Sequence, residues 1–188
     1  MHKSKEKLTG LFCLSAILFY SASFSEQMRE DFCNLASLPE PVQQILAQKF
    51  PGWRVWGSSD LTKEEREHWS KSKNTSDCPG LAVGHFENKE YLSYAFSLVP
   101  VDAEKRGWRL IVLTRNKEAA YQEKIIDKHD DLTGTGELYK APPGKYMDPE
   151  ESATIRLILD GILYEEFEKG ASLFYWQKGV YHELIVDD

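Results

Sequence analysis

The chain changes from a helical to a strand-like hydrophobic pattern after its first third. Val42, Ile45, Leu46 and Phe50 recur at i, i+3, i+4 and i+8, and this spacing places them on one face of an α-helix. Prolines just before this run suit the first turn of a helix, and a Pro-Gly pair directly after Phe50 ends it. The pattern therefore predicts an amphipathic helix over residues 40–49.

Beyond this helix, bulky and small side chains alternate as they do on a pleated β-sheet. Between residues 90 and 99, Leu, Tyr, Phe and Leu alternate with Ser, Ala and Ser, which gives the strand a bulky face and a small-residue face. Residues 108–115 are apolar through their middle, as is typical of a central strand buried on both faces. After a short strand at 53–56, seven or eight strands are predicted from residues 81–86, 90–99, 108–115, 121–128, 154–159, 162–167, 173–177 and 180–186.

Two glycine-containing dipeptides predict tight turns in the last third of the chain. Asp160-Gly161 has the composition preferred in a two-residue type I′ turn and would join the two predicted strands that flank it. Lys178-Gly179 would join the last two strands, with Gly179 in the left-handed conformation of a bulged turn. Nearly all the predicted strands can then pair as antiparallel neighbours.

Two polar stretches separate the apolar segments. Residues 58–77 are charged and almost free of aliphatic side chains, which predicts a solvated loop with a marginal helix over residues 62–71. Thr62 and Glu65 have the spacing of a capping box at its start. Residues 129–150 are rich in Asp, Gly and Pro and predict a long connection. Neither stretch marks a convincing second domain.

The predicted fold class is α+β and mainly β: a single antiparallel sheet or sandwich of seven to eight strands with one N-terminal helix packed on it. The predicted domain covers residues 26–188, and residues 1–25 form a signal peptide. Its basic start is followed by an apolar run over residues 8–20 and by small residues that a signal peptidase accepts. Because this run is short for a membrane span, we expect cleavage rather than an uncleaved anchor. The predicted location is periplasmic or secreted, with no stable membrane anchor after cleavage.

Charge narrows the classes of partner. The full chain has 23 Lys and Arg and 30 Asp and Glu residues. The leader contains three lysines and one glutamate, so 20 basic and 29 acidic residues remain after cleavage, a net charge of −9. Such acidity argues against nucleic acid, whose binding depends on Lys and Arg contacts to phosphates. It favours a cationic protein or a cell-envelope component as partner.

The cysteines predict one covalent cross-link. Cys13 leaves with the leader, so Cys33 and Cys78 are the two cysteines of the mature chain. In an oxidising compartment, such a pair most often forms a disulfide. A zinc site would need a larger ligand set than two separated cysteines provide.

A short segment resembles a known repeat. Gly84, Phe86 and Ala95 occupy positions one, three and twelve of a stretch similar to the FG-GAP repeat unit of calcium-binding propeller blades. The positions that hold calcium ligands and turn glycines in that family are His85, Glu87, Asn88, Lys89, Glu90 and Ser93 here. Calcium needs about six to eight oxygen ligands, and a lysine among them would repel the ion. The resemblance therefore implies a β-hairpin shape without its metal, and we expect no cofactor.

One tight cluster of His and carboxylate side chains is present. Asp127, His129, Asp130 and Asp131 have the residue types of a metal site or an acid/base pair. The alternative interpretation is a solvated strand end that runs into a turn. The sequence contains neither a GxSxG elbow nor an HExxH helix. We therefore assign no catalytic residue and no metal ligand.

Aromatic side chains are the second candidate feature. They are Trp53, Trp56, Tyr175, Trp176 and Tyr181, near the predicted helix and around the last hairpin. Aromatic residues are enriched at binding hot spots and stack on sugar rings, so these residues predict a binding surface. The alternative is that they belong to the core.

Two functional hypotheses follow. The first is an exported, non-enzymatic binding protein, of the inhibitor or immunity type, for a cationic partner in the cell envelope. Its general profile is similar to that of periplasmic lysozyme inhibitors and immunity proteins. The second is a carbohydrate-binding module or a hydrolase whose site is assembled from dispersed residues.

Overall fold

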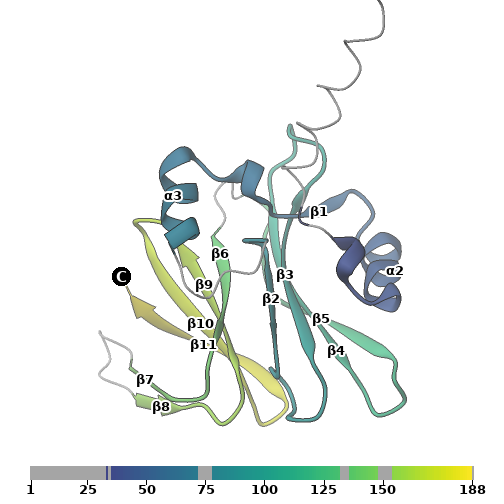
Figure 1. Ribbon diagram of the computed structural model, residues 1–188, viewed down its shortest axis with the longest axis vertical. Helices are drawn as coiled ribbons and strands as arrows, with labels where there is room; N and C mark the ends of the chain where they lie inside the picture. Colours follow the sequence, from purple (N-terminus) through teal and green to yellow (C-terminus); the bar gives the residue numbers. More distant parts are fainter. Residues whose placement is uncertain (1–32, 34, 72–77, 132–135, 148–153, 188) are drawn as a thin grey trace, which may run out of the picture. The chain divides into compact units, whose positions relative to one another are not determined.

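Two antiparallel sheets face each other in the computed structural model, which describes residues 33, 35–71, 78–131, 136–147 and 154–187 (Figure 1). The described residues belong to one compact unit, residues 31–188. The predicted signal peptide, residues 1–25, lies outside the described residues. Within the described part of the chain, every helix is too short or too polar to cross a membrane.

Sheet A contains the first five strands. They are β1 (Trp53–Val55), β2 (Leu81–Gly84), β3 (Ser93–Pro100), β4 (Trp108–Arg115) and β5 (Tyr121–His129). β4 pairs with one edge of β3, while β1 and β2 both pair with the other edge. β1 and β2 therefore lie one after the other along β3, and β5 is the free edge next to β4.

Sheet B contains four later strands in the order β11-β10-β9-β6. Their bounds are β6 (Glu137–Ala141), β9 (Gly161–Glu166), β10 (Gly170–Gln177) and β11 (Val180–Asp187). A separate two-stranded sheet pairs β7 (Lys145–Met147) with β8 (Thr154–Arg156). A backbone hydrogen bond from Leu138 N to Pro79 O, 2.7 Å long, connects β6 of sheet B to the segment before β2.

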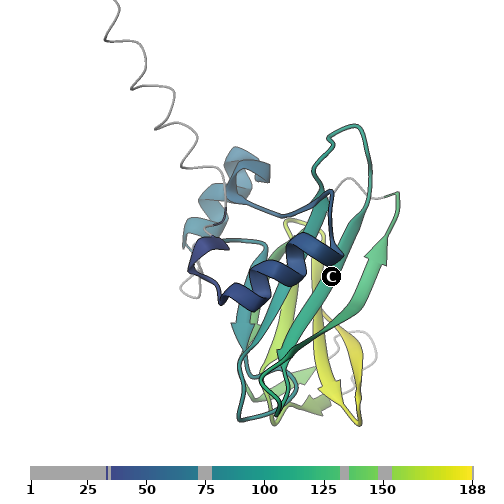
Figure 2. The same cartoon turned by 90° about the vertical axis from the view of Figure 1, so that its right-hand side faces the viewer.

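Two α-helices accompany the sheets. Helix α2 (Glu40–Lys49) crosses the outer face of sheet A, and helix α3 (Lys63–Lys71) lies at the end of β6 and β9 (Figures 1 and 2). The 3₁₀ turns η1 (Leu35–Ser37) and η2 (Ser58–Asp60) precede them. The capping box at the start of α3 is confirmed: Thr62 N donates to Glu65 Oε2 at 2.6 Å, and Glu65 N donates to Thr62 Oγ1 at 3.2 Å.

The alternation along β3 decides how the layers pack. Its bulky residues face α2 and its small residues face sheet B, because successive side chains of a strand point to opposite faces. The outer layer consists of Val42, Phe50, Val55, Tyr94, Phe96, Leu98, Ile111 and Leu113. The core between the sheets consists of Ala82, Ala95, Val99, Trp108, Leu110, Val112, Leu138, Ile162, Tyr164 and Phe174. Small residues on β3 thereby leave room for Trp108, whose Nε1 donates to Ser97 Oγ at 2.8 Å.

The mainly antiparallel β fold is confirmed, but its organisation differs from the predicted one. The strands form several sheets rather than one sheet of seven to eight strands, and α3 is a second α-helix. The predicted connection over residues 129–150 contains β6 and β7. Isolated polar residues in these short strands hid them, because β6 buries Glu137 and β7 is mostly exposed.

The predicted hairpin at Asp160-Gly161 is wrong. β9 pairs with β6 and β10, while β8 pairs with β7. Asp160 instead fastens the start of β9 to the end of β2, because its Oδ2 accepts a hydrogen bond from His85 N at 2.7 Å. A β-carbon at residue 161 would lie 2.7 Å from Leu173 Cδ1, so glycine serves close packing there.

The turn at Lys178-Gly179 joins β10 to β11 as predicted. Gln177 pairs with Val180, and both turn residues have positive φ, 51° for Lys178 and 87° for Gly179. Two positive φ angles define a two-residue type I′ turn, so the connection is shorter than the predicted bulged turn.

The disulfide between Cys33 and Cys78 is confirmed, with a Cα–Cα distance of 4.9 Å. It ties the segment before α2 to the segment before β2. The loop that it closes includes both α-helices and β1.

Candidate functional site

A pocket of about 540 Å³ lies between η1, α2 and β1 on the outer side of sheet A. This volume falls within the roughly 300–1,000 Å³ typical of small-molecule sites. Its apolar wall consists of Leu35, Leu46, Phe50, Trp53, Val55 and Leu98. The residues come from four separate elements, so the pocket exists only when α2 packs on the sheet.

The helical periodicity of α2 positions one wall of the pocket. Val42 is fully buried against sheet A, whereas Leu46 and Phe50, one and two turns later, line the cavity. Gln43 also lines it and is fixed by a hydrogen bond from its Nε2 to Leu38 O at 2.8 Å. The pocket floor is Leu98 of β3, whose side chain is buried.

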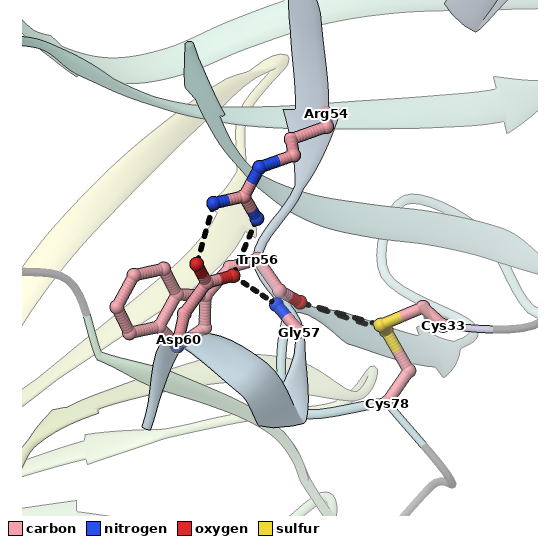
Figure 3. A network of polar contacts seen from close by, with 6 residues as sticks. All are labelled: Cys33, Arg54, Trp56, Gly57, Asp60 and Cys78. Atoms are coloured by element: carbon pink, nitrogen blue, oxygen red, sulfur yellow. Dashed lines mark hydrogen bonds and ion pairs between the residues drawn. A yellow bond between two sulfur atoms is a disulfide. The ribbon is translucent and has the colours of Figure 1, made fainter. Parts of the chain in front are cut away.

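Arg54, which is also among the lining residues, is engaged in an ion pair within the protein. The two terminal nitrogens of Arg54 donate to the two carboxylate oxygens of Asp60, each at 2.5 Å (Figure 3). Asp60 also accepts a hydrogen bond from Gly57 N at 2.8 Å. Because this fork-like pairing engages the guanidinium, the pocket favours an uncharged ligand.

The disulfide forms part of the pocket wall. Cys33 lines the cavity, and its Sγ lies 3.3 Å from Trp56 O, while Cys78 Sγ lies 3.7 Å from the same oxygen (Figure 3). Bonded cysteines carry no S–H group, so these are close contacts rather than hydrogen bonds. The cross-link therefore holds η1 beside the end of β1.

A second candidate site lies where α3 meets sheet B. Glu137 of β6 and Glu165 of β9 are direct cross-strand partners, so the two side chains share one face of the sheet. His68 of α3 joins them: its Nε2 lies 3.2 Å from Glu165 Oε1, and its ring packs on Phe167 with centroids 5.4 Å apart. Three elements thus bring two carboxyl groups and an imidazole together.

Glu137 is unusual among these groups because it is buried, with 5% of its surface exposed. Its Oε2 accepts a hydrogen bond from the Tyr139 hydroxyl, while its Oε1 is buried and has no partner among the described residues. Burial is the main cause that raises the pKa of Glu137, and the nearby Glu165 and Glu65 carboxylates add to it. Tyr139 and His68 act in the opposite direction. The net effect is a pKa above the ordinary value of a glutamate.

The sequence did not reveal this pair. In the sequence Glu165 is adjacent to Glu166, and adjacent strand residues point to opposite faces. Glu137 lies in a stretch predicted to be a connection. The pair depends on β6 pairing with β9 in one particular register, which no local pattern indicates.

The structure keeps two members of the predicted cluster at the end of β5 together, His129 and Asp127, while Asp130 pairs with Arg109. His129 Nε2 lies 3.6 Å from Asp127 Oδ2, and the His129 ring stacks on Trp108 with centroids 5.7 Å apart. Asp130 is exposed and lies 3.8 Å from Arg109, and Asp131 is exposed. Across the described residues, no set of three His, Cys, Asp or Glu side chains is placed to hold a metal ion. The segment has the form of a solvated strand end.

The predicted aromatic surface is divided among three places. Trp53 packs with the α2 layer beneath Arg109, whose Cζ lies 4.3 Å from the ring centroid, and Trp56 packs against the core between the sheets. Trp176 and Tyr181 contact each other with centroids 5.1 Å apart, and Tyr181 packs against the same core between the sheets as Trp56. Tyr175 packs on the other face, in the cluster beside β7 and β8. The five residues therefore do not form one platform.

Trp176 and Tyr181 instead contact Lys124 of β5 and Glu87 of the β2–β3 connection. Glu87, in the β2–β3 connection, accepts from Lys124 Nζ at 2.5 Å and from the Tyr181 hydroxyl at 3.2 Å. Lys124 also lies over the Trp176 ring at 4.8 Å. Glu87 belongs to the segment that resembles an FG-GAP unit, and here its carboxylate binds a lysine of the same chain.

No protein-family model, curated protein or solved structure matches this chain. Functional inference therefore rests on the chemistry of the two candidate sites.

Proposed function

We propose that this chain is an exported, non-enzymatic binding protein and that the pocket beside α2 is its ligand site. The single observation that carries the proposal is a preformed, mainly apolar cavity of about 540 Å³ whose lining arginine, Arg54, is already paired with Asp60. The disulfide supports export, because such bonds persist in oxidising compartments.

The lining defines the class of ligand. Burial of apolar surface is the available driving force, at about 25 cal/mol per Å² of surface removed from water. Gln43 and Arg54 already have partners inside the protein, so a charged ligand would lose hydration without gaining a free counter-ion. We infer an uncharged, mainly apolar molecule, or an apolar side chain of a partner.

A neutral fluorescent probe tests the pocket. N-phenyl-1-naphthylamine should gain fluorescence with the mature protein and raise its unfolding midpoint by mass action. Ala47→Trp fills the mouth of the cavity and should abolish both effects. Gln48→Trp is the matched control, because Gln48 is exposed on the same helix and does not line the pocket. Equal binding by both variants would contradict the proposal.

A cationic envelope protein is the second candidate partner, as expected for an inhibitor or immunity-type protein. The observation that favours it is the convergence of Glu65, Glu137 and Glu165, with His68 between them. Opposite charge steers and orients such partners in a salt-dependent manner. Capture of a purified basic hydrolase at low salt, with loss at high salt, is the expected result. An unchanged interaction at high salt would count against it.

The carbohydrate-binding or hydrolase alternative receives less support from the described residues. A sugar platform needs exposed rings on one surface, and the five aromatic candidates lie in three places. A glycosidase needs two accessible carboxyl groups, and Glu137 is closed off from solvent.

A further inference from the structure

The Glu137 carboxyl group has an unused acceptor in a buried position. Oε1 has no hydrogen-bond partner among the described residues, and Glu137 is 5% exposed. An unpaired buried carboxylate oxygen is costly even for an uncharged group. A charged group without its counter-ion costs more. This oxygen therefore indicates a donor that the described residues do not supply.

The groups around Glu137 define what that donor must be. Glu165 lies directly opposite on β9, and Glu65 of α3 adds a further negative charge. Tyr139 supplies one neutral donor, to the other oxygen of Glu137. His68 is the group that can carry a positive charge, and it binds Glu165 rather than Glu137. The site therefore has more carboxyl groups than side chains that can carry a positive charge.

We propose that Glu137 and Glu165 form an acceptor site for a basic side chain of a partner protein, which takes the place of His68. This inference rests on the second proposed function, the binding of a cationic protein. Arginine fits better than lysine, because its planar guanidinium has five donors and can bridge two carboxyl groups. Cross-strand partners have β-carbons about 4.5–5.5 Å apart, a spacing that such a fork can span.

His68 is suited to be displaced. Its side chain is 48% exposed, and an exposed pair such as His68–Glu165 contributes about 0–1 kcal/mol. No residue of α3 is buried, so small movements of the helix at this point cost little core packing. Displacement of the imidazole would leave Glu165 Oε1 available to the incoming group.

Binding at this site must be linked to proton release. In the free protein the raised pKa of Glu137 favours the neutral acid, whereas a bound guanidinium favours the carboxylate. Wherever Glu137 is protonated in the free protein, binding of the guanidinium therefore releases that proton. Affinity should increase as the pH rises through the pKa of Glu137 in the free protein.

The probe is an acetylated deca-arginine peptide added to the mature protein at low salt. Calorimetry in two buffers of different ionisation enthalpy measures the protons released, at pH 4.5 and pH 7.5. We expect tighter binding at pH 7.5 and net proton release at pH 4.5. Glu137→Gln should weaken binding by roughly tenfold or more, as expected for a lost hydrogen bond to a charged group, and should remove the proton release.

Glu64→Gln is the matched control, because it removes the same charge from an exposed position of α3. It should change the affinity little. His68→Ala removes the competing group and should tighten binding, which also tests the site without altering a buried residue. Equal weakening by Glu64→Gln and Glu137→Gln would overturn the site while leaving net-charge attraction to a cationic partner in place. No binding of the peptide to the wild-type protein would overturn both.

Discussion

Glu137 and Glu165 stand directly opposite each other on β6 and β9, although 28 positions separate them in the sequence. Like charges at such a position destabilise a sheet. Two features reduce the repulsion between the two carboxylates. His68 contacts Glu165, and burial raises the pKa of Glu137. The pair therefore couples folding to pH.

Stability should fall as the pH rises because of Glu137. A folded pKa above the ordinary value of about 4.3 gives a contribution that is complete below that value and is lost as the pH rises through the folded pKa. Glu137→Gln stays neutral, so it should match the wild type near pH 4 and exceed its free energy of unfolding at pH 7.5. Urea unfolding of the variant and the wild type at pH 4 and pH 7.5 measures these differences in the free energy of unfolding.

Glu123→Gln provides a control of opposite sign. A hydrogen bond from Lys49 lowers the pKa of Glu123, so its contribution is present at neutral pH and lost as the pH falls through the folded pKa. Glu123→Gln should therefore be less stable than the wild type at pH 7.5. If both substitutions shifted stability in the same direction at pH 7.5, the assigned role of Glu137 would be incorrect.

The disulfide should stabilise the fold and preserve the pocket. Cys33→Ser with Cys78→Ser should lower the free energy of unfolding by about 2–5 kcal/mol, the usual effect in a small secreted domain. The strands should form as before, because both sheets keep their own apolar contacts. Binding of the neutral probe should weaken, since η1 loses its attachment beside β1. Urea unfolding measures the loss of stability, and circular dichroism tests whether the strands form.

The ion pair between Lys124 of β5 and Glu87 should contribute to the stability of the fold. The Glu87 side chain is 9% exposed, so Lys124→Met leaves a largely buried carboxylate without its counter-ion. We expect a loss of about 3 kcal/mol, near the lower end for a buried pair because Lys124 is one-third exposed. Adding Glu87→Gln should recover part of this loss. If Lys124→Met with Glu87→Gln were less stable than Lys124→Met alone, the loss could not be due to an unpaired Glu87 carboxylate.

A buried hydroxyl pair links β3 and β4. Thr114 Oγ1 donates to Ser93 Oγ at 2.9 Å, and Ser93 is fully buried. Thr114→Val should cost about 1–3 kcal/mol, because it leaves the Ser93 hydroxyl without this partner. The double variant with Ser93→Ala removes both polar groups and should be closer to the wild type. Thermal unfolding of the wild type, the two single variants Thr114→Val and Ser93→Ala, and the double variant completes the cycle, and additive losses would argue against coupling.

Local patterns predicted the parts of the fold that depend on nearby residues. The helix over residues 40–49, the two faces of β3 and the burial of β4 were all predicted, because amphipathic period reports which face meets the core. The capping box of Thr62 and Glu65 is likewise confirmed by two local hydrogen bonds. These features need no knowledge of distant segments.

The incorrect predictions share a different cause. Asp160-Gly161 has the composition of a hairpin turn, but Asp160 binds the backbone of His85, 75 residues away, and β9 pairs elsewhere. The positions of the aromatic candidates likewise depend on the sheets to which they belong. Neighbours such as Tyr175 and Trp176 face opposite sides of sheet B, so closeness in sequence did not place them together.

The sequence by itself determined the main element types, the disulfide pair and the acidic charge, because periodicity, cysteine count and composition are local or summed properties. Only the tertiary structure decided which strands pair, that α2 leaves a pocket on sheet A, and that Glu137 meets Glu165 and His68. Strand pairing is a long-range choice set by the best combined burial of both sheets. A shift of one residue in the β6–β9 register would move Glu137 to the other face and abolish the site.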